Sequence, residues 1–545
     1  MFRNGYGRCV AILVWAWCAS LSWSDRAQAT DYFLTIGGGY NRTGNQASLE
    51  ANVVFFQQVL RDRHQGPRRH VIYFADGHDP AADLQVLAEK PAKNELPATE
   101  VIASLHRRRG QEHVTYRNHR VDEIAGALDP ALIRGQFESL AKTVQTGDRL
   151  IVYVTAHGSA GPQDDPFNTT IDCWNERKIT AREFTELLNL FPREVPVVMV
   201  MAQCYCGGFG HTIFQGLDET RGLAPQLRAG FFAQQHNLPA AGCRPDIEHD
   251  EEFSSYFWGA LAGRSRNGVP IADCDVDGNG VISFAEAYAY AVVAGETIDI
   301  PLRTSEVFLR KYSRSGPAGE SPSVAETETP RPANPASGDD AEGEDKPREA
   351  PAQTKAATVV LTGTLQDYVD RSRPVSGRIV KKLSETLGFK LQDDVSTVVS
   401  AADELRRAGR GAGRGRPGFG GGRRGGGGRR EFLRQITEKW PELGDPRRWE
   451  ESALLKPENQ QTLLAELQQL PGWKAFDERR QQMEAAGNQS SQQELRGVKF
   501  RRLLNTLEAI QLERDLPGCA SAEIVERYRQ LLTLEESAFT SGESR

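Results

Sequence analysis

The sequence predicts an α/β fold with a mainly parallel sheet flanked by helices, followed by a linker and a separate, mostly α-helical C-terminal region. Two apolar runs, LIVYVTAHG from residue 150 and PVVMVMAQCYCGGFG from residue 196, carry the first part of this prediction. Both are rich in Val and Ile and lack polar alternation, which is typical of strands covered by helices on both faces. The third observation is a change of composition beyond Tyr312, where large apolar residues become rare.

The N-terminal stretch has the features of an export signal. In residues 1–29, two arginines precede an apolar run, and Ala27-Gln28-Ala29 supplies the small residues of a cleavage site before Thr30. The alternative is a retained membrane anchor, but a spanning helix needs about 20 apolar residues and this run is shorter. We therefore expect cleavage near Ala29/Thr30, a secreted or periplasmic protein, and no integral membrane segment afterwards.

Residues 30–312 are predicted to form one α/β unit, because strand and helix patterns alternate along them. Besides the two apolar runs, strands are expected at DYFLTIGGG, HVIYFADG and RAGFFAQ (228–234). Helices are expected at SLEANVVFFQQVLRD, where Ser48 is placed as the N-cap, at 130–144, at ITAREFTELLNL, where Thr180 and Glu183 form a capping box, and at DEEFSSYFWGALAG. The polar segment 80–125 is expected to contain loops and an insertion.

Each of the two central apolar runs stops at a residue that can take part in chemistry. The first ends at His157-Gly158, and the second reaches Cys204. Ligands of open α/β sheets bind at the carboxyl ends of the strands, so neighbouring strands would bring the imidazole and the thiol to one edge. We predict Cys204 as a nucleophile, His157 as its general acid/base, and Gly158 and the Cys204 backbone as the lining of an oxyanion site. The expected reaction is acyl transfer, most simply hydrolysis of a peptide bond.

Other interpretations of these residues remain open. His157 alone is a common strand-end histidine, and Cys204 alone is a common buried thiol. Cys206 is an alternative nucleophile, or a redox partner of Cys204, and along one strand the two would share a face. Six cysteines remain after signal cleavage, too few for a disulfide scaffold in so long a chain. They are Cys173, Cys204, Cys206, Cys243, Cys274 and Cys519.

The same segments resemble the catalytic core of the caspase and legumain superfamily of cysteine peptidases. VYVTAHG resembles the strand that ends in His-Gly, MAQCYCGGF resembles the nucleophile strand, and histidine about fifty residues before cysteine is the order described for caspases. The resemblance covers about Asp31 to Ser313 and implies a caspase-hemoglobinase fold, a Cys/His dyad and a polypeptide substrate. Ala202 and Cys206 depart from the family pattern, which leaves an inactive or redox-controlled relative open.

Substrate preference cannot be derived from these motifs. Six acidic residues in the predicted loops have two interpretations. They form an acidic pocket that binds an Arg or Lys side chain of the substrate, or they are charges exposed to solvent. They are Asp164, Asp165, Asp172, Asp246, Glu248 and Asp250. With such a pocket, the Arg-rich tract at 407–430 would be a site of self-cleavage.

Residues 275–286 match the calcium loop of the EF-hand at every ligand position. The expected ligands of Ca²⁺ are the side chains of Asp275, Asp277, Asn279, Ser283 and Glu286, together with the backbone carbonyl of Val281. Gly280 supplies the sharp turn. The alternative is an acidic turn that merely resembles the loop. Because the sequence shows no second, paired loop, we expect the ion to have a structural role in preference to a sensing role.

The remaining chain differs in character. Residues 313–356 are dense in Pro, Ala, Ser, Glu and Asp, which predicts a disordered linker. Residues 357–545 show apolar residues at helical spacing, interrupted by the Gly/Arg-rich tract 407–430. That tract is either a flexible cationic loop or a contact for polyanions.

Three functions are compatible with the whole sequence. The favoured one is an exported, calcium-binding cysteine endopeptidase. The others are a catalytically inactive caspase-like scaffold or binding protein, and a thiol redox protein that uses Cys204 and Cys206. The net charge of −7 favours none of them.

Overall fold

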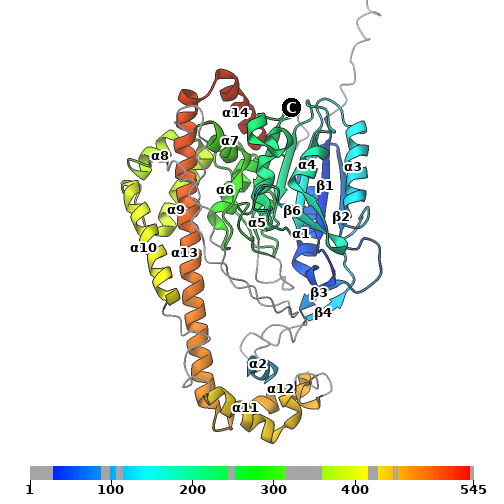
Figure 1. The fold of residues 1–545 in the computed structure, drawn as a ribbon, viewed down its shortest axis with the longest axis vertical. Helices are drawn as coiled ribbons and strands as arrows, with labels where there is room; N and C mark the ends of the chain where they lie inside the picture. The colour runs from blue at the N-terminus through cyan, green and yellow to red at the C-terminus, as the bar shows by residue number, and fades with distance from the viewer. Residues whose placement is uncertain are drawn as a thin grey trace, which may run out of the picture.

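The computed structural model describes residues 29–87, 98–105, 114–242, 252–313, 359–414, 427–445, 449 and 452–539. The predicted export signal, nearly all of the predicted linker and the middle of the Gly/Arg-rich tract therefore lie outside the described residues. The described chain forms an α/β body and a set of C-terminal helices, one of which is very long (Figure 1).

The body is built on a six-stranded sheet with the order β10-β9-β8-β5-β1-β2. Five strands run parallel, and β10 pairs antiparallel with β9. The strands are β1 Asp31–Gly38, β2 Arg68–Phe74, β5 Arg149–Ala156, β8 Val197–Met201, β9 Arg228–Phe232 and β10 Leu302–Arg303. The α/β class with a mainly parallel sheet was thus predicted correctly from the apolar runs.

Helices cover both faces of this sheet, since every residue of β5 and β8 is buried. Phe56 and Trp258 pack on Tyr153 of β5, while Phe137 and Phe184 pack edge to face at 5.7 Å in the same hydrophobic core. The helices are α1 Ala47–Arg63, α3 Pro130–Thr143, α4 Ala181–Leu188, α5 Phe253–Ala262, α6 Phe284–Ala294 and α7 Thr304–Tyr312. Two antiparallel hairpins lie outside the sheet: β3 Leu84–Leu87 with β4 Val114–Arg117, and β6 Thr170–Cys173 with β7 Arg177–Thr180.

Of two predicted helix caps, one is confirmed and one is wrong. Thr180 and Glu183 form the capping box of α4, in which the Thr180 N–H donates to Glu183 Oε2 at 2.9 Å. Ser48 does not cap α1, because the N-cap position is Gln46, two residues earlier. The Ser48 hydroxyl instead donates to the carbonyl of Gly242 at 2.7 Å. The Ser48 hydroxyl therefore makes a hydrogen bond to a residue distant in the chain, and it does not make the helix-capping bond that the sequence spacing suggested.

The C-terminal helices are α8 Leu365–Arg371, α9 Pro374–Leu387, α10 Val395–Arg414, α11 Gly427–Lys439, α12 Gln460–Gln468, α13 Trp473–Cys519 and α14 Ala522–Glu535. Short 3-10 turns include η3 Cys206–Ile213 and η1 Arg42–Gly44. Ile379 of α9, Leu503 of α13 and Leu531 of α14 belong to the same hydrophobic core as β5 and β8. The expectation that the helical region is separate from the α/β body was therefore wrong. Amphipathic spacing shows that a helix has an apolar face, but it does not show what that face packs against.

A second, smaller core lies at the far end of α13, whose 47 residues span about 70 Å at 1.5 Å per residue (Figure 1). There α11 and α12 meet α2 (Ala98–Leu105), which belongs to the predicted insertion of the α/β unit. Ile102, Phe432 and Leu467 are fully buried in this core. The Thr99 N–H donates to Gln460 Oε1 at 3.0 Å, so the insertion is tied to the C-terminal helices.

The segment after α14 is held at the amino ends of the strands. Arg149 is 1% exposed, forms two hydrogen bonds with the Asp31 carboxylate, and donates to the carbonyl of Ala538 at 2.9 Å. Phe539 follows and packs on Trp258 and Phe284. This segment completes the core of the α/β body.

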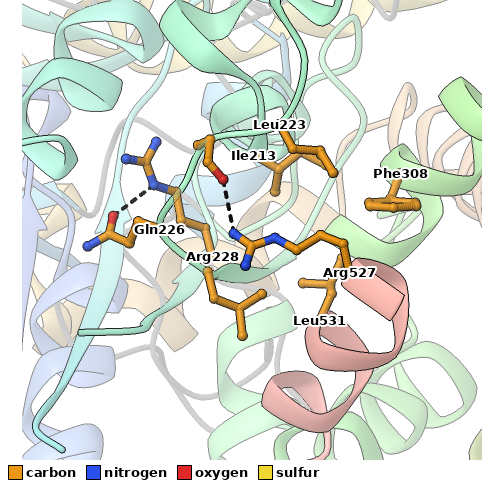
Figure 2. A pocket seen from close by; sticks show the side chains of 9 residues that line it. Ile213, Leu223, Gln226, Arg228, Phe308, Arg527 and Leu531 are labelled. Atoms are coloured by element: carbon orange, nitrogen blue, oxygen red, sulfur yellow. Dashed lines mark hydrogen bonds between the residues drawn. The ribbon is translucent and has the colours of Figure 1, made fainter. Parts of the chain in front are cut away.

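Helix α14 itself docks beside β9. Arg527 donates to the carbonyl oxygens of Ala224 at 2.9 Å and Pro225 at 2.8 Å, next to a small pocket that Phe308 and Leu531 help to line (Figure 2). Neither Cys204 nor His157 lines this pocket. Among the described residues, no helix has the length and apolarity needed to cross a bilayer.

Replacing Phe539 tests whether the segment after α14 is part of the core. We expect Phe539→Ala to lower the free energy of unfolding by about 3 to 5 kcal/mol, because a buried aromatic side chain is lost and a cavity remains. Urea denaturation followed by tryptophan fluorescence measures this. Leu132→Ala, at a side chain that is 47% exposed, is the control. Equal, small effects of both variants would contradict the docking of Phe539.

Candidate active site

Strands β5 and β8 are direct neighbours in the sheet, and their carboxyl ends carry the two predicted catalytic residues. Val154 lies opposite Met201 at the end of the pairing. His157 follows β5 directly, and Cys204 follows β8 after a short turn. A Cβ atom added to Gly158 would overlap with the carbonyl oxygen of Cys204, so the two segments are in backbone contact. The predicted juxtaposition of the two segments is therefore present in the structure.

The imidazole of His157 is oriented by the loop that follows β1. Its Nε2 lies 2.7 Å from the carbonyl oxygen of Gly44 and 2.9 Å from Gln46 Oε1. Because a carbonyl oxygen can only accept, Nε2 carries the proton and Nδ1 is the basic nitrogen. Burial lowers the pKa of His157, and the hydrogen bond to Gly44 and the charge of Asp172 oppose this shift. The ring is thus neutral at pH 7, which suits a general base.

Gly44 and Gln46 were not identified from the sequence. The position of this loop could have identified it, because it follows the three glycines at the end of β1 and so lies at the same edge of the sheet. Asn45 holds the loop in place: its Oδ1 accepts from the Gly39 N–H at 3.0 Å, and its Nδ2 donates to Asp83 at 2.7 Å. No local pattern indicates which atoms of this loop meet the histidine.

The thiol of Cys204 lies against the backbone of Ala240. The Ala240 N–H donates to Sγ at 3.3 Å, and the carbonyl oxygen of the same residue lies 3.7 Å from Sγ. Burial raises the pKa of Cys204 to about 11, although the Ala240 hydrogen bond lowers it. Within the described residues no hydrogen bond joins Sγ to His157, and the raised pKa keeps the Cys204 thiol in its neutral form.

The turn that presents Cys204 is strained. Tyr205 has a φ of +60°, which bulky residues rarely adopt, and its N–H donates to the carbonyl of Leu238 at 3.0 Å. In the described part of the chain, no backbone hydrogen bond engages the N–H of Gly158 or of Cys204. The Gly158 N–H is a candidate donor for an oxyanion next to Sγ, and the Cys204 N–H interacts with its own thiol.

Cys206 lies away from this edge. Strand β8 ends at Met201 and the chain turns at Tyr205, so the expectation that both thiols share one face of a strand was wrong. The Cys206 thiol is fully buried, accepts from the Gln234 N–H at 3.3 Å, and has a pKa raised well above its ordinary value by burial. All cysteines in the described residues are free, namely Cys173, Cys204, Cys206, Cys274 and Cys519, and Cys243 lies outside them.

The loop carboxylates considered for substrate recognition are dispersed. Asp172 lies beside the candidate dyad, because its N–H donates to the carbonyl of His157 at 2.9 Å. Its carboxylate accepts from Ser159 Oγ at 2.8 Å and Thr170 Oγ1 at 2.6 Å. Asp165 forms an ion pair with Arg182 at 2.8 Å. Asp164 is exposed, and Asp246, Glu248 and Asp250 lie outside the described residues.

The predicted calcium loop gathers its carboxylates in one small volume. Oxygen atoms of Asp275, Asp277 and Glu286 all lie within 4.8 Å of one another. Asp275 accepts from the Gly280 N–H at 2.8 Å, and this hydrogen bond closes the sharp turn. An all-oxygen set of this kind suits a hard cation such as Ca²⁺.

The flanks of this loop differ from those of a complete EF-hand. Helix α6 begins at Phe284 as expected, with Ser283 and Glu286 forming its capping box. Before the loop, α5 ends at Ala262, and residues 264–274 contain no helix. Asn279, Val281 and Ser283 occupy the remaining predicted ligand positions.

Glu252 is a buried carboxylate behind the candidate dyad that the sequence did not single out. It is 2% exposed and accepts from Ser254 Oγ at 2.5 Å and from Asn52 Nδ2. Asn52 also donates to Thr155 Oγ1 at 3.1 Å, two residues before His157. Burial raises the pKa of Glu252 to about 7. This network joins α1, β5 and the start of α5.

Glu252 makes the stability of the fold depend on pH. Because its pKa is raised in the folded state, its stabilising contribution is present below about pH 4.5 and is lost as the pH rises through 7. We expect Glu252→Gln to gain stability over the wild type by on the order of 3 kcal/mol between pH 4.5 and 8. Chemical denaturation at several pH values measures the difference, with the exposed Glu194→Gln as control. A difference that does not change with pH would contradict this.

No family model matches the chain, and no curated protein matches it either. A similar solved structure is the crystal structure of a structural-genomics target protein from Geobacter sulfurreducens. It is 10% identical, the match covers 51% of this chain and 93% of that chain, and the TM-score is 0.28. A likeness this low carries no argument about fold or function. The resemblance to the caspase and legumain superfamily remains a prediction.

Proposed function

We propose that the chain is a calcium-binding cysteine endopeptidase of the caspase and legumain type, acting after export. The observation that carries the proposal is the pairing of β5 with β8, because it brings His157-Gly158 into contact with Cys204 at the carboxyl edge of the sheet. A thiol, an imidazole and the backbone N–H groups of Gly158 and Cys204 at one edge are the parts that acyl transfer needs.

The reaction follows from the tautomer of His157. With Nε2–H held by Gly44, Nδ1 accepts the proton of the Cys204 thiol. The thiolate attacks the carbonyl carbon of the scissile peptide bond, and the N–H groups of Gly158 and Cys204 stabilise the oxyanion. His157 then gives its proton to the leaving amine as the C–N bond breaks. Water, deprotonated by Nδ1, hydrolyses the thioester and releases the free enzyme.

Cys204 is the favoured nucleophile of the two neighbouring thiols. Cys206 is fully buried between η3 and the end of β9, and it has no route to a polypeptide. The same burial disfavours a redox pair, since a disulfide exchange partner has to reach one of the two sulfurs.

A non-catalytic binding protein is the second candidate function. The observation that favours it is the burial of the Cys204 thiol, which raises its pKa to about 11 and so keeps the thiol neutral at pH 7. In this alternative, the helical C-terminal region and the Gly/Arg-rich tract carry the binding, with polyanions as partners.

Covalent labelling separates the two candidates. We expect peptidyl electrophiles with Arg, Lys, Asn or Asp before the reactive carbon to modify Cys204, as mapped by mass spectrometry. His157→Ala should reduce the labelling rate by about 100-fold or more, because the general base is lost. Cys206→Ser is the matched control and should label like the wild type. Equal labelling of the wild type and His157→Ala would rule out the dyad.

Calcium binding is tested at Glu286. We expect saturating calcium at about 100 times its dissociation constant to stabilise the wild type by about 2.7 kcal/mol. Glu286→Gln should lose most of this gain, because the closing carboxylate loses its charge. Thermal unfolding with calcium, with magnesium and with a chelator measures the gain. Glu186→Gln, at an exposed residue of α4, is the control. A calcium effect of the same size in Glu286→Gln would place the ion elsewhere.

A further inference from the structure

Residues 238–242 form a segment that crosses the carboxyl edge of the sheet beside Cys204. We call it the 238–242 segment. Ala240 in its middle contacts the Cys204 thiol through both its N–H and its carbonyl. On either side, the carbonyl of Leu238 accepts from the Tyr205 N–H at 3.0 Å, and the carbonyl of Gly242 accepts from Ser48 Oγ at 2.7 Å. The backbone next to the candidate nucleophile is thus set by contacts from several elements.

A buried carboxylate fixes the centre of this segment. Asp299 is 1% exposed, and its Oδ1 accepts from the Ala241 N–H at 2.7 Å. Its Oδ2 accepts from Thr297 Oγ1 at 2.8 Å, so the carboxylate belongs to a tight turn after α6. Ala241 directly follows the residue that contacts the thiol, so the position of Asp299 determines the position of Ala240.

The turn that carries Asp299 is in turn held by the C-terminal region. Arg502 of α13 is 2% exposed, and it donates to the carbonyl oxygens of Asp299 at 2.8 Å, Val292 at 2.9 Å, Gly295 at 2.6 Å and Thr297 at 3.1 Å. These acceptors include carbonyls of the last turn of α6, which have no partner inside the helix. A guanidinium group can donate hydrogen bonds to several neighbouring carbonyl oxygens at once, because its N–H donors are fixed in one plane.

Arg502 thereby connects α13 to the candidate nucleophile through three links. The guanidinium holds the turn at 292–299, Asp299 in that turn holds Ala241, and Ala240 contacts the Cys204 thiol. Each link is a hydrogen bond between groups that are at least mostly buried. Burial raises the pKa of the Asp299 carboxyl, and the charge of Arg502 lowers it by a smaller amount, so the two groups interact through charge as well.

We propose that Arg502 is a positioning residue of the active site, which acts through Asp299 on the 238–242 segment beside Cys204. The C-terminal helical region is then a working part of the site, although it contributes no group to the chemistry. This inference rests on the proposed function where it concerns catalysis. Where it concerns the environment of the thiol, it stands on the contacts alone.

The experiment compares two readouts in full-length Arg502→Ala. Alkylation of Cys204 by iodoacetamide at pH 7.5 should become about tenfold faster, because the segment that covers the thiol loosens. The kcat/KM for hydrolysis of the best peptide substrate should fall about tenfold, because the 238–242 segment is no longer held in a single conformation beside Cys204. Millimolar guanidinium should occupy the vacated space and return both rates towards the wild type.

The controls keep a positioning role apart from general destabilisation. Arg496→Ala removes an arginine of the same helix whose contacts, among the described residues, are with Leu387 and Phe500 of the C-terminal region, and it should change neither rate. Cys206 and Cys274 are buried and should stay unlabelled in Arg502→Ala. If the alanine variant does not fold, Arg502→Lys keeps the charge with fewer donors and should give intermediate rates.

The outcomes are decisive in both directions. An unchanged alkylation rate of Cys204 in the folded variant would overturn the proposal. The proposal would also be overturned if Cys206 and Cys274 were labelled together with Cys204 in Arg502→Ala and guanidinium restored neither rate. A wild type that hydrolyses no peptide, combined with faster and rescuable alkylation in Arg502→Ala, would refute the peptidase and leave the positioning role standing.

Discussion

The pairing of two fully buried parallel strands, β5 and β8, is the constraint on which the candidate site depends. Parallel strands end at the same edge of a sheet, so whatever follows each strand is brought together there. In this chain those residues are His157 and Cys204. The glycine after the histidine allows the two turns to touch. Burial of both strands by helices fixes their relative position, and it also removes the neighbourhood of the thiol from water.

Burial has opposite consequences for the two groups. It lowers the pKa of His157, which keeps a neutral base ready, and it raises the pKa of Cys204, which keeps the thiol protonated. The imidazole and the thiol are therefore both neutral at pH 7. The loop around Gly44 and the 238–242 segment set the orientation of the base and the cover of the thiol. Both come from parts of the chain distant from the motifs themselves.

The C-terminal region completes the α/β body instead of standing apart from it. Arg149 and Asp31, at the amino ends of two strands, hold the segment that carries Phe539. Arg502 holds the turn at the other end of α6, and α6 begins at the predicted calcium loop. The predicted calcium loop, the contact of α13 with the α/β body and the surroundings of the thiol are therefore all connected to α6. Such shared elements are where binding at one place can change the population of states at another.

The amino-acid sequence was enough to predict the parallel sheet, its main helices, the capping box at Thr180 and the approach of the His157-Gly158 and Cys204 segments. These follow from local periodicity, from helix-cap spacing and from the rule that parallel strands end at one edge. Three contacts became known from the folded structure alone: Ser48 bonds to Gly242, Gly44 orients the histidine, and Arg502 reaches the turn at Asp299. Each of these contacts joins residues distant in the chain through backbone carbonyls. Every residue carries such a carbonyl, so no residue type or spacing marks it in advance.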